Sequence, residues 1–326
     1  MRVTPPPPNL ISAQFGRTVA TLRENITQTA EESTTGRYSD LTAHLSGRIG
    51  TAMLSQKAVD DIAFRREQLS LREGRLDVTQ QSLGLIHDRV LGLDTRMREA
   101  LANGNELSQG LTARDAKAAL GNVFNMLNVR FGERFLFAGD ATATQPLGSP
   151  DELLADLRNL ADTAIDAADF AASLDTYFNT PGGGWQTSML QSSPNASDPD
   201  AVTANDPALV GLISGLAMMA LSDPDTSPAL LKTDPDIVQA GAERVTSGLT
   251  ALTNVRADRG VIQEQIEVEK QSLNVEETIF TIALNNLSVR DQYEAATTLK
   301  QLESTLEASY LLTSRLSSLS LLNYLR

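Results

Sequence analysis

The chain has 326 residues, of which 41% are hydrophobic and only 5% aromatic, and it carries a net charge of -14. It contains no cysteine and only two histidines. This composition excludes disulfides and thiolate metal sites and argues against histidine-rich metal sites. We therefore expect long helices joined by aliphatic side chains, and we predict no catalytic, cofactor-binding or metal-binding residues.

The negative charge is concentrated in the middle of the chain. Residues 140–236 hold fifteen acidic residues against Arg158 and Lys232, a net charge of -13, which leaves -1 for the rest. An acidic middle argues against nucleic-acid binding, which needs a basic surface. The sequence contains no apolar run of about 18 residues, the length that a membrane-spanning helix needs. The N-terminus lacks the apolar segment of a cleaved signal peptide, so export would need another route.

Apolar residues follow helical spacing at both ends of the chain. The first set precedes Gly36, which is predicted to end its helix. Chain ends normally fray unless something holds them, so we expect both helix faces to have a partner in the same chain or in a neighbouring copy. We predict that these residues form an assembly surface: Ile11, Phe15, Val19, Leu22 and Ile26, with Leu299, Leu302, Leu306, Leu312, Leu316, Leu319 and Leu322.

Two longer segments carry apolar residues at or near seven-residue spacing, which is typical of a coiled-coil seam. We predict one helix over residues 53–102, preceded by a loop or broken helix at 38–50. The second seam lies beyond the acidic middle and ends at a polar interruption at residues 285–286 and 290–291. The two seams predict antiparallel helices. Their members are Ile62, Leu69, Leu76, Leu83, Val90 and Met97, and Val245, Leu252, Val255, Ile262, Ile266 and Leu273.

The remaining segments predict a mainly α fold: a long antiparallel coiled-coil-like rod with a small mixed α+β inserted domain. We expect a helix over 107–132, a buried strand at 135–139, a helix over 151–178 and a strand at 185–190. Five parts follow from this pattern. They are an N-terminal assembly helix at 1–36, rod helices at 37–139, an acidic outer domain at 140–236, a rod helix at 237–290 and a C-terminal assembly helix at 291–326.

Three Asp-Pro-Asp triplets, at residues 198–200, 223–225 and 234–236, raise the possibility of a cation site. Their spacing lacks the alternating ligands, central glycine and distal glutamate of an EF-hand loop. Turn and capping chemistry is the better interpretation. For Asp206-Pro207 and Asp234-Pro235 we expect an aspartate N-cap followed by proline as the first helical residue.

Two segments, 293–299 and 306–325, resemble the C-terminal helix of flagellin-like proteins, and most of all that of the hook–filament junction family of hook-associated proteins. Phe135-Leu-Phe-Ala-Gly139, Thr35-Gly36-Arg37 and residues 255–266 also resemble parts of that family. One stretch departs from it: Tyr38-Ser39-Asp40-Leu41 stands where the family often has a Pro-Ser-Asp-Asp-Pro-like sequence. The acidic middle matches no family pattern.

The resemblance implies a non-enzymatic structural subunit of the bacterial flagellum, located outside the cell. It implies export through the flagellar type III apparatus without a cleaved signal, assisted by a chaperone. The expected partners are copies of the chain in a ring, a neighbouring hook-associated protein and flagellin, with neither nucleic acid nor membrane. Two alternatives stay open: a flagellin, or a helical bundle whose middle is a binding module with a pocket around Trp185.

Overall fold

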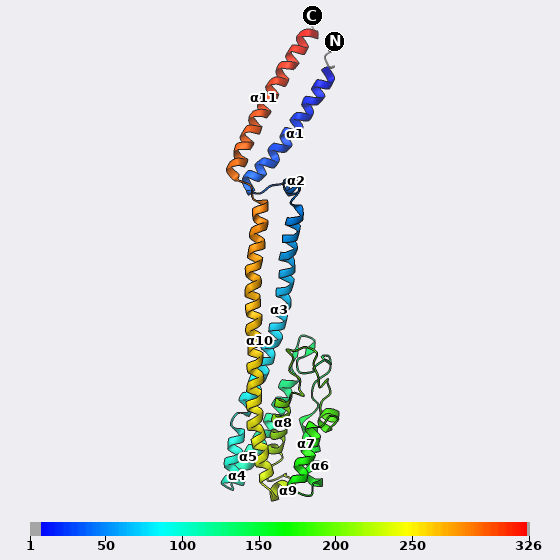
Figure 1. Cartoon of the computed structure of the whole chain (residues 1–326), viewed down its shortest axis with the longest axis vertical. Helices are drawn as coiled ribbons and strands as arrows, with labels where there is room; N and C mark the ends of the chain where they lie inside the picture. The colour runs from blue at the N-terminus through cyan, green and yellow to red at the C-terminus, as the bar shows by residue number, and fades with distance from the viewer. Residues whose placement is uncertain (1–7, 325–326) are drawn as a thin grey trace. The chain divides into compact units, whose positions relative to one another are not determined.

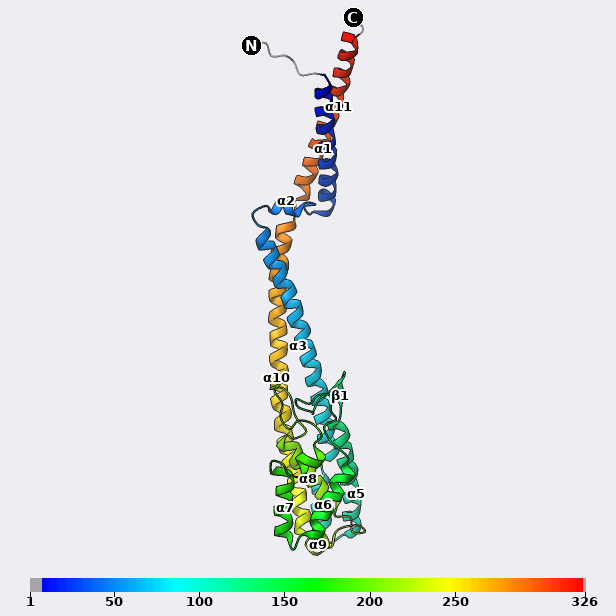
Figure 2. The same ribbon diagram turned by 90° about the vertical axis from the view of Figure 1, so that its right-hand side faces the viewer.

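The computed structural model describes the backbone of residues 8–324 and the side chains of residues 13–315. The fold is mainly α, as predicted (Figure 1; Figure 2). The helices are α1 (Pro8–Thr35), α2 (Leu41–Leu45), α3 (Ile49–Val90), α4 (Leu93–Ala102), α5 (Glu106–Leu127), α6 (Pro150–Thr163), α7 (Ala167–Asn179), α8 (Pro207–Ala220), α9 (Ala229–Thr233), α10 (Asp236–Ser288) and α11 (Gln292–Tyr324). Strands β1 (Arg130–Phe131) and β2 (Arg134–Phe135) form one antiparallel pair, and Trp185–Met189 is a π-helical turn.

The chain divides into two compact units. The first comprises residues 1–66 and 271–326, and the second comprises residues 67–270. The acidic middle lies wholly in the second unit, where its apolar residues belong to the same buried cluster as those of α4, α5 and the first part of α10. The acidic segment 140–236 therefore shares one hydrophobic core with α4, α5 and the first part of α10. The division of the chain into five parts with separate roles in assembly stays a prediction.

The predicted seams are buried and antiparallel. Every member of the first seam is at most 6% exposed, and Leu252, Ile266 and Leu273 of the second seam are buried as well. In the second unit, Lys270 Nζ lies 2.7 Å from Glu73 Oε2, and Gln80 Nε2 donates to the Arg256 carbonyl at 2.7 Å. From the first of these contacts to the second, the residue number rises on α3 and falls on α10, so the two helices run antiparallel, as predicted.

Helix α8 is the centre of the second unit. Nearly all of its residues are buried, and it packs against α5, α6 and α10. Glycines allow a close approach to α10: a Cβ atom on Gly215 would lie 2.6 Å from the Gly241 carbonyl oxygen, and one on Gly248 would lie 2.9 Å from the Leu212 backbone. A contact this close leaves no room for a larger residue, so these glycines fix how the two helices pack.

Two predicted helices are each divided in the structure. The helix expected over residues 53–102 ends at Val90 and restarts at Leu93, because Gly92 adopts a left-handed conformation with φ of 80°, which glycine accepts without a Cβ clash. The helix expected over 151–178 is α6 followed by α7. Asp166 starts the second of these by accepting the Asp169 backbone N–H, at 2.9 Å.

The strands predicted at residues 135–139 and 185–190 are not formed as regular strands, so both predictions are wrong. Only Phe135 of the segment 135–139 is in a strand, and the rest bonds to a neighbouring loop, with Ala204 N–H donating to the Phe137 carbonyl at 2.9 Å. The segment 185–190 is a π-helical turn followed by an isolated bridge between Leu190 and Leu147. The segment 135–139 is apolar because it is largely buried, and burial alone does not distinguish a strand from other compact backbone. In the segment 185–190 only Trp185, Met189 and Leu190 are buried, while Thr187 and Ser188 are exposed.

The polar interruption predicted at residues 290–291 is confirmed, whereas the part predicted at residues 285–286 is wrong. Helix α10 continues through both asparagines to Ser288, since asparagine weakens a helix without breaking it. The break comes at residues 289–291, where Asp291 starts α11 by accepting the Tyr293 backbone N–H at 2.8 Å.

Candidate assembly surface

Helices α1 and α11 pair along their lengths in the first unit, which confirms the predicted pairing of the first helix with the last (Figure 1; Figure 2). They run antiparallel, because Arg23 contacts Tyr310 while Glu32 contacts Arg290. The predicted side chains of both helices are half-buried in this pair: Phe15, Val19, Leu22 and Ile26 on α1, and Leu299, Leu302 and Leu306 on α11.

The pair leaves apolar surface in solvent. Leu312, a predicted surface residue, is 53% exposed, and the neighbouring Leu311 and Tyr310 are exposed too. The other four predicted residues, Ile11, Leu316, Leu319 and Leu322, lie outside the side chains that the structure describes. Two helices can bury only the strip along which they touch. The half-buried and exposed aliphatic side chains are therefore available to a further helix.

One polar contact fixes the alignment of this pair. Arg23 Nε donates to the Tyr310 hydroxyl at 3.0 Å, and the Arg23 guanidinium lies 5.8 Å from the centre of the same ring. Both side chains are exposed, so the contact contributes little stability but opposes sliding of one helix along the other.

A buried ion pair joins the end of α1 to the start of α11. Glu32 and Arg290 form this pair, with side chains only 8% and 17% exposed, and Glu32 also accepts the Ser39 backbone N–H at 2.9 Å. Two backbone bonds close the same junction: Tyr38 N–H to the Ser288 carbonyl at 3.1 Å, and Arg290 N–H to the Gly36 carbonyl at 2.9 Å. We call these contacts the joint.

Aromatic and glycine residues complete the joint. Tyr38 stacks on His44 with ring centres 3.5 Å apart, and the Arg290 guanidinium lies 5.2 Å from the Tyr38 ring centre. Gly36 has φ of 67°, so it ends α1 as predicted and turns the chain toward Arg290. Sequence reasoning identified Gly36 and the polar interruption but not their pairing, because nothing in the local pattern relates residue 32 to residue 290.

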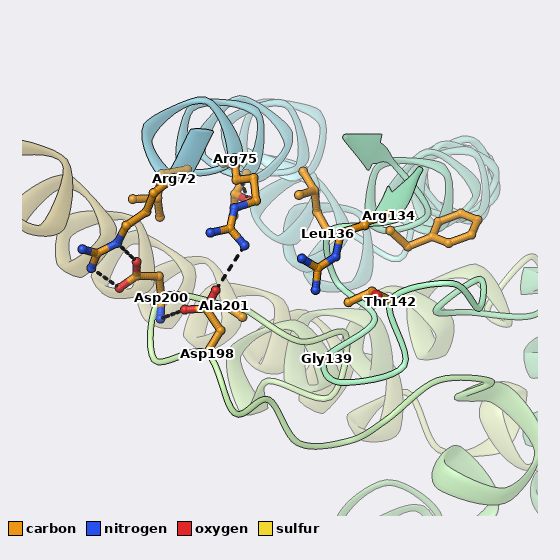
Figure 3. A pocket seen from close by; sticks show the side chains of 12 residues that line it. Arg72, Arg75, Arg134, Leu136, Gly139, Thr142, Asp198, Asp200 and Ala201 are labelled. Atoms are coloured by element: carbon orange, nitrogen blue, oxygen red, sulfur yellow. Dashed lines mark hydrogen bonds and ion pairs between the residues drawn. The ribbon is translucent and has the colours of Figure 1, made fainter. Parts of the chain in front are cut away.

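In the second unit, the triplet at residues 198–200 is an arginine-binding turn (Figure 3). The Asp198 carboxylate accepts the Asp200 backbone N–H at 3.0 Å, which is the predicted turn chemistry. Asp200 binds Arg72 of α3 through both carboxylate oxygens, and Asp198 binds Arg75 at 3.3 Å. The hydrogen bond from Arg72 holds the pKa of Asp200 below its usual value, against the opposing effect of burial.

The other triplets use the same turn. Asp223 accepts the Asp225 N–H at 3.2 Å, and Arg114 of α5 binds both carboxylates, at 2.9 and 2.8 Å. The hydrogen bond from Arg114 lowers the pKa of Asp223. Asp234 accepts the Asp236 N–H at 3.2 Å, and α10 begins at Asp236, one residue later than the start expected at Pro235. Asp206 caps α8 with Pro207 in its first turn, as predicted. The triplets are thus turns and caps, and two of them bind arginine.

The surroundings of Trp185 and the cavity beside the Asp198–Asp200 turn are both poor ligand sites. Trp185 is completely buried, and its indole N–H donates to Asn205 at 3.1 Å, so no ring face is open. Burial and a hydrogen bond to Asp156 raise the pKa of nearby Tyr177, which disfavours it as a proton donor or acceptor near neutral pH. The cavity beside Arg72 and Arg134 holds about 70 Å³, room for a few waters only.

The described residues contain neither a grouped set of metal ligands nor a helix suited to a membrane. Among them, no group of three or more histidine, aspartate or glutamate side chains is placed to hold a metal ion. None of the helices within the described part of the chain is both long enough and apolar enough to cross a membrane.

The C-terminal quarter of the chain matches a known family. Residues 242–325 match the model of the bacterial flagellin C-terminal helical region. This region is flagellin-like. It covers most of α10 and all of α11, and it includes the seven predicted surface leucines at positions 299–322. A search of curated proteins finds no match.

Two solved structures are similar to the chain. The first is the crystal structure of FlgL from Bacillus cereus, with 14% identity and a TM-score of 0.37, over 72% of this chain and 96% of that one. The second is a putative flagellar hook-associated protein from Vibrio parahaemolyticus, with 12% identity and a TM-score of 0.35, over 82% of this chain and 95% of that one. At these TM-scores, neither likeness establishes the fold of this chain.

Proposed function

We propose that this chain is a structural subunit of the bacterial flagellum that joins hook to filament and assembles through α1 and α11. The proposal rests mainly on the flagellin-like region at residues 242–325. The aliphatic face that the α1–α11 pair leaves exposed to solvent agrees with it. Assembly of copies would bury this face. The aliphatic side chains, rather than ion pairs, would supply most of the association free energy.

The partners and route belong to the same proposal. Copies of the chain form a short ring, with a hook-associated protein on one side and flagellin on the other. The chain leaves the cell unfolded through the flagellar export apparatus with a dedicated chaperone and without a cleaved signal. In this role the protein catalyses no reaction, and the arginine-bound turns of the second unit stabilise the fold.

Deletion of Ser309–Arg326 tests the role of the terminal helices. In a flagellated bacterium lacking its own gene for this chain, the truncated protein is expected to be exported but to leave filaments detached. The thermal unfolding of the second unit should be unchanged, because these residues lie in the first unit. Normal filament attachment by the truncated chain would contradict the proposal.

A single substitution in α11 distinguishes loss of the assembly surface from loss of the whole C-terminal segment. Leu306→Glu places a carboxylate on the half-buried face of α11, whereas Ser304→Glu places the same charge at an exposed position of the same helix. The proposal predicts detached filaments for the first variant and normal attachment for the second. Equal behaviour of the two variants would argue that this face of α11 is not an assembly surface.

Flagellin is the nearest rival role. A flagellin extends into long filaments, whereas a junction subunit stops at a short ring. Electron microscopy of the purified chain under polymerising salt distinguishes the two, and long homopolymers would favour the rival. A binding module around Trp185 is the more distant alternative, which the complete burial of that ring disfavours.

A further inference from the structure

The inner seam between α3 and α10 is only partly apolar in the second unit. A two-helix seam needs apolar residues at the seven-residue spacing and also three residues beyond each of them. Beyond residue 83 both positions are filled, and Ile86 of α3 and Leu93 of α4 are buried at the second one. Before residue 83 the second position holds Arg72 and Thr79. This stretch of α3 therefore offers less apolar contact to α10.

The direct polar contacts across the same stretch are weak. Lys270 Nζ lies 2.7 Å from Glu73 Oε2, and Gln263 Nε2 donates to Asp77 Oδ1 at 2.6 Å. Both contacts are open to water, since the Lys270 and Glu73 side chains are about a quarter exposed and the Gln263–Asp77 contact is fully exposed. Polar pairs in contact with water contribute little stability. Something else must hold α3 against α10 at this level.

The turn at residues 198–200 binds both helices there (Figure 3). On α3, Asp200 holds Arg72 through both carboxylate oxygens, and Asp198 holds Arg75. On α10, Arg259 Nη1 donates to the Pro199 carbonyl at 2.8 Å. The Asp200 side chain is only 10% exposed, and a two-pronged carboxylate–arginine contact is among the stronger polar contacts. Three consecutive residues therefore join two helices.

The loop that carries the turn is itself anchored. Before the turn, Ser197 N–H donates to the Asp140 carboxylate at 2.7 Å. After it, Val202 and Ala204 are buried in the core of the second unit. The turn is thus fixed on both sides, so it cannot follow α3 and α10 if they separate.

We infer that residues 198–200 act as a clip that holds α3 against α10 where their seam is polar, and that this part of the seam opens only when the clip releases. The clip joins elements of one copy, so the inference does not rest on the proposed function. It gives the acidic middle of the chain a mechanical role: one of its loops replaces apolar contacts that the two long helices lack.

Amide hydrogen exchange in the full chain tests the clip. The amides to follow are those of residues 69–80 on α3 and 256–266 on α10, whose local exchange needs the seam to open. If the clip must release first, Asp200→Asn should speed this exchange by about 5- to 30-fold on both helices. Unchanged exchange of these amides, or faster exchange on α3 alone, would overturn the inference.

Asp223→Asn is the matched control. Asp223 also lies in an Asp-Pro-Asp turn, has a side chain only 14% exposed and binds an arginine, but that arginine is Arg114 of α5. This variant should destabilise the second unit and leave the exchange of residues 69–80 and 256–266 unchanged. Equal acceleration by both variants would overturn the inference, because the seam would then open only when the whole unit unfolds.

Arg259→Met tests the other side of the clip, whether or not Asp200→Asn folds. Methionine keeps an aliphatic stem but has no hydrogen-bond donor, and the contacts of Asp200 and Asp198 with α3 remain. Exchange should become faster on α3 as well as on α10, because the two helices share the turn. Faster exchange on α10 alone would show that the turn does not couple them.

Acid gives a measurement on the unchanged chain. The charged groups around Asp200 are Arg72, Arg75, Arg259, Asp198 and Arg134, and Glu269 acts on Arg72. The hydrogen bond from Arg72 lowers the pKa of Asp200, so the clip is intact above about pH 4 and releases as the pH falls through the folded-state pKa. After correction for intrinsic rates, residues 69–80 and 256–266 should lose protection over that range, and lose less in Asp200→Asn. Identical profiles for the two proteins would contradict the clip.

Discussion

Replacing Glu32 by glutamine should loosen the joint between α1 and α11. Glu32 and Arg290 are both largely buried, so the substitution leaves the Arg290 charge without its partner in a poorly solvated place. Breaking a buried ion pair typically costs about 3–5 kcal/mol. Glutamine can still accept the Ser39 N–H, and Arg290 keeps its contact with the Tyr38 ring, so we expect about 2–4 kcal/mol here.

Amide hydrogen exchange measures this loss where it occurs. The N–H groups of Tyr38 and Arg290 bond across the joint, so their exchange reports its opening. A loss of about 2–4 kcal/mol corresponds to exchange faster by roughly 30- to 1000-fold. Glu31→Gln is the matched control, because Glu31 is the exposed neighbour on the same helix. Equal exchange in the two variants would refute the claim that the ion pair holds the joint.

Three further predictions concern the second unit, each measured by thermal or denaturant unfolding. Asp200→Asn should lower the free energy of unfolding by about 1–2 kcal/mol, less than for a fully buried ion pair because Arg72 is partly exposed. Since the folded-state pKa of Asp200 is lowered, its contribution is full above about pH 4 and is lost as the pH falls through the folded-state value, so the two proteins should converge in acid. Gly215→Ala should cost about 1–3 kcal/mol through its contact with α10, whereas Gly211→Ala in the same helix meets open space and should be neutral or slightly stabilising. Leu83→Ala in the buried seam should lower the free energy of unfolding by about 2–5 kcal/mol, whereas Leu85→Ala, at a half-exposed position, should lower it little in dilute solution.

Each of these predictions has a result that would contradict it. An Asp200→Asn chain as stable as the unchanged one at neutral pH would mean that the turn at residues 198–200 does not need its arginine. Equal stability of the two glycine variants would disprove the close packing of α8 on α10. A large loss at Leu85 in dilute solution would mean that this half-exposed side chain contributes to the core as the seam residues do.

Periodicity predicted the parts of the fold that depend on one helix face. The seam residues such as Leu83 and Met97 are buried because a seven-residue spacing allows only one buried side. Local chemistry also predicted the ends of helices, as at Gly36 and Asp206, because a cap needs only its own neighbours. Long helices, caps and antiparallel pairing were therefore accessible from the sequence alone.

What the sequence did not reveal depends on partners far along the chain. Trp185 begins a segment that was expected to be a strand, but it lies in a π-helical turn, and only Leu190 forms an isolated bridge. The pairing of Asp200 with Arg72 joins residues 128 positions apart, and a charge count alone suggests only a solvent-facing surface. Such contacts depend on how distant segments of the chain pack together, which no local pattern specifies.

In the proposed role, the apolar face of the terminal helices is covered by neighbouring copies and not within one molecule. Maleimide labelling of a Leu312→Cys variant tests it most directly, with Ile165→Cys, on an exposed turn of the second unit, as the control. We expect rapid labelling of both variants in dilute solution and, after assembly, strong protection of position 312 alone. Labelling at position 312 that is already slow in the lone molecule, or unchanged by assembly, would contradict it.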